Sequence, residues 1–214
     1  MKYAYAGSAF HDAIGEFYGT ISDSPHGGLI EGTFQSILDR HWTSRGLDRI
    51  KEVRSRKETC FKNFVKFEKY RLTICSQYKP TLIEQRVRAN INNIPYLTIP
   101  DVYWRQDEWI VDWKSGRMNS LGEKEFVQGQ VEAMILRALG MPVKKVTFVC
   151  LLTGFVLDLP KIENEFVEAK VHKMLRYYRD KKFPKTKGDH CRWCGHQLRC
   201  EFQDRGWWLF GDDS

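Results

Sequence analysis

Residues 109–116 read WIVDWKSG, and this stretch decides how the rest of the chain is interpreted. Branched and aromatic residues alternate there with polar ones, which is typical of a β-strand. Because successive side chains of a strand point to opposite faces, Asp112 and Lys114 share one face. Trp113, which lies between them, points to the other face. The stretch therefore predicts a carboxylate and an ammonium side by side on an otherwise apolar strand.

Two further strands are predicted upstream, at residues 82–91 and 94–105, with an Asn-Asn turn between them. Together with the WIVDWKSG strand they would form a three-stranded meander. The second of them carries Asp101, and a short hairpin joins it to the strand of Asp112. We therefore expect Asp101 to lie beside Asp112.

Two carboxylates held close together repel each other unless a cation lies between them. Hard oxygen ligands select Mg²⁺ or Mn²⁺, and a lysine beside such an ion can position or activate the attacking water. The alternative for Asp112 and Lys114 is a simple surface ion pair. Glu84, on the first strand, is either a further acid of this site or an exposed edge carboxylate.

The remaining segments predict an α/β fold in one domain. Helices are expected at residues 8–21, 125–139 and 162–179 and as a pair within 29–72, and short strands at 145–152 and 155–159. This order places a central sheet between flanking helices. The single domain, 1–214, is expected to have three parts: a helical part at 1–81, a catalytic sheet and helix at 82–160, and a C-terminal helix with a cysteine cluster at 161–214.

The charge balance favours a polyanionic partner. The chain of 214 residues holds 34 Lys and Arg against 27 Asp and Glu, a net charge of +7. Lys and Arg are dense between residues 40 and 71, which predicts either a solvated helix surface or a basic wall beside an active site. No apolar stretch is long enough for a membrane span, and the first residues lack the apolar core of a signal peptide. We therefore expect a cytoplasmic protein without a membrane contact.

The six cysteines are unevenly distributed. Cys191, Cys194 and Cys200 form the pattern C-x2-C-x5-C, and without an export signal a metal centre is favoured over disulfides. Cys150 lies in an apolar run and is expected to be a buried small hydrophobe.

The sequence contains Pro100-Asp101 and, further on, Asp112-Trp113-Lys114. This pattern resembles the P-D…(D/E)-x-K signature of the restriction-endonuclease-like superfamily. Within it the chain is most similar to the RecB-type nucleases, including the iron–sulfur nucleases of CRISPR adaptation and the AddB-type repair nucleases. GSAFHDAIGEFY resembles the helix of that group that carries a metal-binding histidine, here His11. FVQGQVEAMILRALGMPV resembles the helix of that group that follows the D-x-K strand and carries a glutamine, for which Gln130 is the first choice and Gln128 the second.

The resemblance implies a divalent-metal-dependent deoxyribonuclease with a restriction-endonuclease-like sheet, which hydrolyses phosphodiester bonds by in-line attack of a metal-bound water. Asp101, Asp112 and His11 would hold Mg²⁺ or Mn²⁺. Lys114 would activate or position the water, and Gln130 would support it. Single-stranded DNA is the expected substrate because RecB-type relatives commonly degrade it, and exonuclease and endonuclease action both stay open.

CRWCGHQLRC resembles the C-terminal cysteine cluster of the same group, which implies an iron–sulfur cluster of the 4Fe-4S type that staples the last segment to the domain. That group takes its first cysteine from a segment before the histidine helix, where this chain has none. Cys60 is expected to supply the missing ligand. The alternatives are Cys75, a cysteine from a start further upstream, or zinc held with His190 or His196.

Two other functions fit the same residues. One is a non-catalytic nucleic-acid-binding module with a zinc knuckle, against which the intact acids and lysine argue. The other is a nuclease subunit that is active only in a repair or CRISPR-adaptation complex, or as a homo-oligomer; an exposed apolar tail would favour it.

Overall fold

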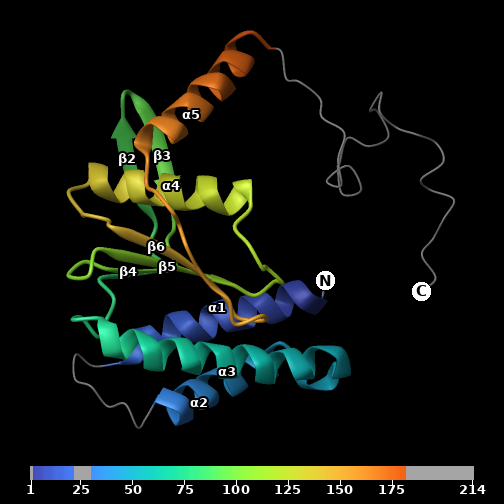
Figure 1. The fold of residues 1–214 in the computed structure, drawn as a ribbon. Helices are drawn as coiled ribbons and strands as arrows, with labels where there is room; N and C mark the ends of the chain where they lie inside the picture. The colour runs from blue at the N-terminus through green and yellow to red at the C-terminus, as the bar shows by residue number, and fades with distance from the viewer. Residues whose placement is uncertain (1, 22–29, 182–214) are drawn as a thin grey trace, which may run out of the picture. The chain divides into compact units, whose positions relative to one another are not determined.

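A five-stranded mixed sheet with helices on both faces is the main feature of the fold (Figure 1). The computed structural model describes residues 2–21 and 30–181, and its internal contacts divide the chain into two units, 1–168 and 169–214. The sheet belongs to the first unit, where its strands follow the order β1 (Leu82–Ile83), β4 (Val102–Trp104), β5 (Trp109–Lys114), β6 (Lys145–Cys150) and β7 (Val156–Asp158). Only β5 and β6 are parallel, and the helix between them provides the crossover that a parallel pair needs.

The structure breaks each of the long strands predicted at residues 82–91 and 94–105 into two. The first break is at Glu84, whose φ of 45° is incompatible with an extended strand. The second is at Pro100, which has no backbone N–H to donate to a neighbouring strand. The predicted three-stranded meander is therefore wrong, because local backbone geometry ends both strands early.

The residues between the two breaks form a separate hairpin of β2 (Val87–Ile91) and β3 (Ile94–Thr98). Its turn is the predicted Asn-Asn pair, in which both residues have positive φ, at 51° and 62°. Such a turn matches the twist of a two-stranded hairpin. The hairpin leaves the central sheet at Glu84 and returns at Asp101, and the Glu84 N–H donates to the Asp101 carbonyl at 2.8 Å. Both ends of the excursion thus meet at one point.

Helices cover both faces of the sheet, as the α/β prediction requires (Figure 1). The helices are α1 (Lys2–Thr20), α2 (Ile30–Ser44), α3 (Lys51–Ile74), α4 (Glu123–Ala138) and α5 (Asn164–Arg179), with a short 3-10 turn at Leu47–Arg49. α1, α2 and α3 lie on one face, and α4 packs on the other. Among the described residues, no helix is both long and apolar enough to cross a membrane.

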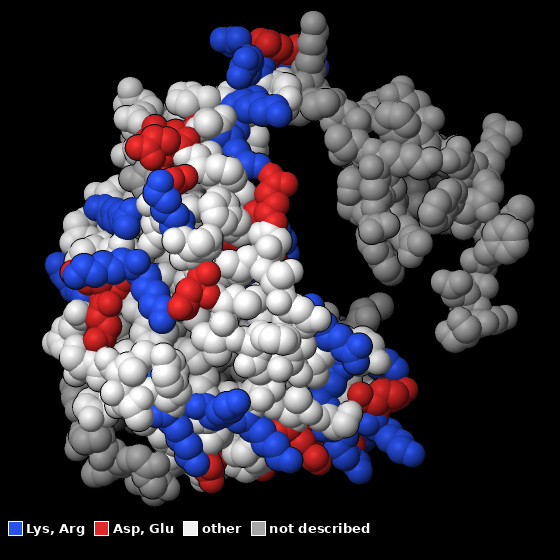
Figure 2. Space-filling view, in the orientation of Figure 1, with Lys and Arg blue, Asp and Glu red and all other residues white. Residues whose placement is uncertain are grey.

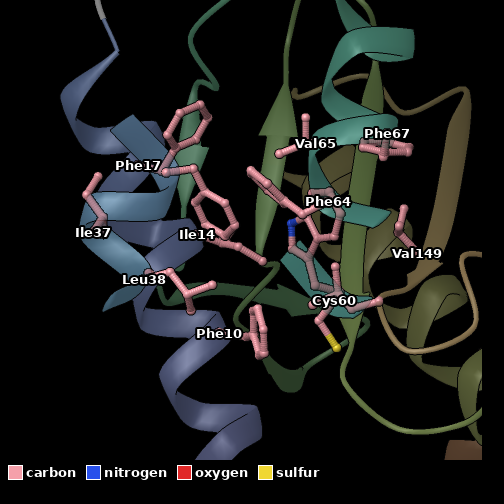
Figure 3. Close-up of a cluster of buried hydrophobic side chains, with 14 of the residues drawn as sticks. Phe10, Ile14, Phe17, Ile37, Leu38, Cys60, Phe64, Val65, Phe67 and Val149 are labelled. Carbon is pink, nitrogen blue, oxygen red and sulfur yellow. The ribbon is translucent and has the colours of Figure 1, made fainter. Parts of the chain in front are cut away.

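The core beneath α1, α2 and α3 is rich in aromatic residues (Figure 3). Phe10 and Phe17 of α1 are buried in this core. Phe64 of α3 stacks on Phe34 at 3.9 Å between ring centroids and contacts Trp113 of β5 at 5.2 Å. This core therefore fixes β5 by the face that carries Trp113.

The opposite face of β5 belongs to a second core, which packs under α4 and the β2–β3 hairpin. Ile110 of β5 is buried there together with Ala133 of α4 and Ala89 of β2. Ile110 and Trp113 lie in different cores, so the predicted alternation of the strand is confirmed. Asp112 has the same parity as Ile110 and is directed to the α4 side.

An ion pair is buried between α1 and α3. Glu68 and Arg71 are each 1% exposed, and their side chains lie 2.8 Å apart. The hydroxyl of Tyr18 donates to the same Glu68 carboxylate at 2.5 Å. Burial and the charge of Glu68 raise the pKa of Tyr18 well above its usual range, so the phenol stays protonated. The three side chains therefore tie the two helices together inside the core.

The basic residues between 40 and 71 do not form an unbroken basic wall. Acidic partners from α1 and α2 neutralise several of them, in the pairs Arg40–Glu16, Arg45–Asp12, Lys57–Asp39 and Lys69–Glu31. Figure 2 accordingly shows blue and red side chains interspersed over the part of the molecule where α2 and α3 lie. The structure favours the simpler of the two predictions, a solvated helix surface with ion pairs.

Candidate active site

An open cleft of about 700 Å³ lies where α1, the end of β5 and the start of α4 approach one another. Its walls include Asp101, Asp112 and Lys114, the acids and the lysine singled out in the sequence. His11 of α1 and Gln128 of α4 complete the polar lining. The basic helix α3 contributes no lining residue within the described part of the chain.

The hairpin between β4 and β5 brings the two acids together, as the sequence predicted. Val102 pairs with Val111, so continuing this antiparallel register by one residue places Asp101 opposite Asp112. Asp101 Oδ2 also accepts a hydrogen bond from the backbone N–H of Trp113 at 2.7 Å. This bond holds the Asp101 carboxylate at the start of β4, beside the end of β5 that carries Asp112.

His11, Glu84 and Asp101 form a cluster of potential metal ligands. One ligand atom from each lies within 4.8 Å of the others, and His11 Nδ1 is 3.5 Å from Asp101 Oδ1. The three residues come from α1, the break after β1 and the start of β4. Of the two alternatives for Glu84, the structure therefore supports membership in the site.

Two glycines let α1 approach this cluster closely. Gly7 and Gly15 lie one turn before and one turn after His11, on the same side of the helix. A Cβ atom at Gly7 would lie 2.6 Å from Ser115 Oγ, and one at Gly15 would lie 3.3 Å from the Glu84 carboxylate. Larger residues would push the helix away, so the spacing Gly-x3-His-x3-Gly positions His11.

Asp112 and Lys114 are linked through Gln128. The Lys114 ammonium lies 2.8 Å from Asp112 Oδ2, as an ion pair without the alignment of a hydrogen bond. It also donates to Gln128 Oε1 at 2.8 Å, while the Gln128 amide donates to Asp112 Oδ1. Gln128 therefore orients both groups of the strand at once.

Gln130, the first choice for this supporting role, does not reach the cleft. It is fully buried, and its amide donates to the carbonyl of Lys161 at 2.5 Å and accepts from the N–H of Glu163 at 2.6 Å. The choice of Gln130 over Gln128 was wrong because the two lie about 200° apart around the helix. Helical spacing separates them, but only the packing of α4 on the sheet selects which one faces β5.

Glu132 is a buried acid behind the cleft that the sequence interpretation missed. It is 1% exposed, and its Oε1 accepts from the Gln128 amide at 2.9 Å. Its other oxygen has no hydrogen-bond partner among the described residues. The available signal was a lone acid in the apolar run VEAMIL, one turn after Gln128. Glu132 thus holds the amide that orients Asp112 and Lys114.

The site concentrates negative charge in a poorly solvated place. Burial, and then the charge of Asp101, raise the pKa of Asp112 to about 6 against the opposing effect of Lys114. Burial and the charge of Asp112 raise the pKa of Glu132 well above its usual range. Burial, and then the charge of Asp101, also raises the pKa of Glu84. A cation in the cleft would relieve the repulsion that these shifts reflect.

The negative charge of the site also raises the pKa of His11. Burial lowers the pKa of His11, but the hydrogen bond to Asp101 and the charge of that carboxylate outweigh burial, so the net shift is upward. Two carboxylates and one imidazole form a donor set that suits Mn²⁺ and Mg²⁺. The residues present therefore fit a divalent metal held by His11, Glu84 and Asp101. Asp112, which was also expected as a ligand, lies outside this cluster and adds negative charge nearby, where it contacts Lys114 and Gln128.

The predicted C-terminal metal centre cannot be placed in the same way, because Cys191, Cys194 and Cys200 lie outside the described residues. Cys60, expected as the fourth ligand, is 2% exposed in the aromatic core (Figure 3), and burial raises its pKa to about 12. These surroundings are those of an inert buried thiol. Cys150 is buried, as the sequence predicted.

The mixed sheet, with two acids and a lysine at one cleft, defines the restriction-endonuclease-like class of α/β proteins. A comparison with family models agrees: residues 2–201 match the model of the PD-(D/E)XK nuclease superfamily. The chain belongs to the PD-(D/E)XK nuclease superfamily. No curated protein and no solved structure matches the chain.

Proposed function

We propose that this protein is a metal-dependent deoxyribonuclease of the RecB and AddB type that cleaves single-stranded DNA. The observation that carries the proposal is the contact of Gln128 with both Asp112 and Lys114 in the cleft that also holds His11 and Asp101. Superfamily membership supports nuclease chemistry in general. The preference for a single strand rests on the resemblance to RecB-type nucleases.

The ligand cluster and the cleft residues divide the work of hydrolysis among them. His11, Glu84 and Asp101 would hold Mg²⁺ or Mn²⁺, which supplies a Lewis acid and makes bound water more acidic. Lys114 presents its ammonium to the cleft, where it can donate hydrogen bonds to a phosphate oxygen or to the attacking water. As water attacks phosphorus and the bridging P–O bond breaks, this ammonium stabilises the added negative charge.

The substrate part of this proposal is tested by incubating the purified protein with linear and circular single-stranded DNA and with duplex DNA, in Mg²⁺, in Mn²⁺ and without a divalent metal. We expect metal-dependent digestion of the single strands. Circles separate the two modes of attack, because only an endonuclease can open them. Digestion of duplex DNA alone would contradict the single-strand preference, and no digestion at all would contradict the proposed activity.

Gln128→Ala is expected to lower the cleavage rate about 10-fold to 100-fold, the usual cost of losing a residue that orients an active group. The loss should appear mainly in kcat, because Gln128 orients Asp112 and Lys114, which act in the chemical step. Gln130→Ala is the matched control on the same helix. It should reduce stability, through its bonds to Lys161 and Glu163, and leave kcat unchanged. Wild-type kcat in Gln128→Ala would contradict the role.

His11→Ala is expected to shift the activation of cleavage to higher Mn²⁺ concentration without unfolding the protein. The reason is that it removes one of three clustered ligands. The measurement is the rate of digestion against Mn²⁺ concentration, with the exposed His172→Ala as the control. A His11→Ala protein that melts far below wild type, with an unchanged Mn²⁺ requirement, would make His11 a structural residue.

We further propose that Cys191, Cys194 and Cys200 hold an iron–sulfur cluster, with zinc as the alternative metal. Three thiolates from one short segment suit either centre. The fourth ligand stays open between Cys60, Cys75 and a nearby histidine, and the apolar surroundings of Cys60 weigh against it. Metal analysis of anaerobically purified protein decides between iron, zinc and neither. Protein that contains neither iron nor zinc would contradict the proposed metal centre.

A further inference from the structure

The outer face of the β2–β3 hairpin is exposed and lies next to the cleft. On the inner face, Val87 and Ala89 are buried in the core under α4. On the outer face, Arg88 lies opposite Leu97 in the hairpin register, and both are exposed. The alternation of a strand therefore sets aside one face for packing and leaves the other free.

The outer face is continuous with the active-site cleft. Leu97 lies in β3, and Ile99 follows one residue after the strand ends. Both are unusually open for aliphatic residues, at 49% and 45% exposed, and Ile99 also lines the cleft. Asp101 of the ligand cluster follows two residues later. A molecule bound across the cleft thus meets Ile99 first and Leu97 next.

Two arginines carry the charge at an outer position of β2 and at the residue just before that strand. Arg86 and Arg88 are both exposed, and neither forms an ion pair with a described residue. The other outer positions of the hairpin, Asn90 and Pro95, carry no charge. This differs from α3, where acidic neighbours neutralise several of the basic side chains. Two unpaired guanidinium groups beside exposed aliphatic side chains match a ligand that is both anionic and apolar.

We propose that the outer face of the β2–β3 hairpin binds single-stranded DNA next to the cleft. Arg86 and Arg88 contact backbone phosphates, and Leu97 and Ile99 contact base faces. A single strand presents exposed base faces, whereas a duplex hides them in its stack and offers these aliphatic side chains little apolar surface. That the bound single-stranded DNA is also the substrate rests on the proposed nuclease function. The binding of single-stranded DNA to this face does not.

The test measures binding of a labelled single-stranded oligonucleotide to the full-length chain, without added divalent metal, over a range of salt concentrations. The Arg86→Ala/Arg88→Ala double variant should bind about 10-fold or more weakly at low salt. Its slope of log affinity against log salt should fall by about 1.4, because each lost phosphate contact on a single strand removes about 0.7. Arg105→Ala is the matched control, an exposed arginine in the turn between β4 and β5.

Leu97→Ser tests the apolar contact independently of the two arginines. It should weaken binding of single strands without changing the salt slope, because it removes an apolar contact and no charge. Its effect on duplex DNA should be absent. Circular dichroism of each variant checks that the hairpin substitutions, which alter exposed side chains, leave the fold intact.

The outcomes separate this inference from the proposed activity. If wild-type protein cuts no DNA but the double variant still loses affinity and slope, the nuclease proposal fails and the binding surface stands. If the double variant keeps wild-type affinity and slope, the surface is refuted whatever the activity. An equal loss of affinity for duplex DNA in all variants would refute its specificity for single strands.

Discussion

Asp112→Ala and Lys114→Ala are each expected to lower DNA cleavage by about three orders of magnitude or more, which corresponds to roughly 4 kcal/mol or more of transition-state stabilisation. Lys114 is the ammonium that faces the cleft, and Asp112 holds it at 2.8 Å. Removing either residue leaves no oriented ammonium where the phosphate gains negative charge. Single-turnover cleavage of a labelled oligonucleotide in Mg²⁺ and in Mn²⁺ measures the loss.

Lys144→Ala is the matched control for this result. Lys144 is 76% exposed and pairs with Glu108 at the opposite end of β5 from the cleft. It should cut DNA at the wild-type rate. Asp112→Ala and Lys114→Ala should keep the melting behaviour of a folded protein, so that loss of rate reports on chemistry. Wild-type rates in both variants would show that another site performs the cleavage.

Glu68→Ala is expected to lower the free energy of unfolding by about 3–5 kcal/mol, the usual cost of removing one partner of a buried ion pair. The substitution leaves the Arg71 guanidinium buried without its carboxylate and removes the acceptor of the Tyr18 hydroxyl. Urea unfolding followed by tryptophan fluorescence measures the change, since Trp104 packs against both Tyr18 and Arg71.

Glu52→Ala tests the same residue change on the same helix at the surface. Its ion pair with Lys2 is exposed on both sides, so its loss should leave the unfolding midpoint nearly unchanged. Replacing Glu68 and Arg71 together by methionine should restore much of the stability, because no buried charge is then left unpaired. A Glu68→Ala protein as stable as Glu52→Ala would contradict the role of the buried pair.

Short-range pattern was enough to locate the central strand and its acids. The alternation of Ile110, Asp112 and Lys114 with Trp113 follows from the two-residue period of a strand, and the structure places Ile110 and Trp113 in different cores. The hairpin that brings Asp101 opposite Asp112 is also local, because few residues separate the two strands. Such features depend on neighbours in the chain, so they can be read without knowing the fold.

The breaks in the sheet were beyond that kind of reasoning. Residues 82–91 and 94–105 have continuous strand patterns, yet positive φ at Glu84 and the missing N–H of Pro100 divert the chain into a separate hairpin. Whether such a segment stays in one sheet depends on what else can pair with it and what covers it. Here α4 covers the hairpin's inner face, and the central sheet closes by pairing β1 with β4.

The same limit explains the two glutamines and the missed acid. Gln128, Gln130 and Glu132 lie within about one turn of a single helix, and all have polar side chains. The helical period gives the directions of these side chains relative to one another, but not which of them faces the sheet. The rotation of α4 about its axis is set by the burial of Ala133, Ile135 and other apolar residues against β5 and β6. That packing, between segments distant in the sequence, directs Gln128 and Glu132 toward Asp112 and turns Gln130 away.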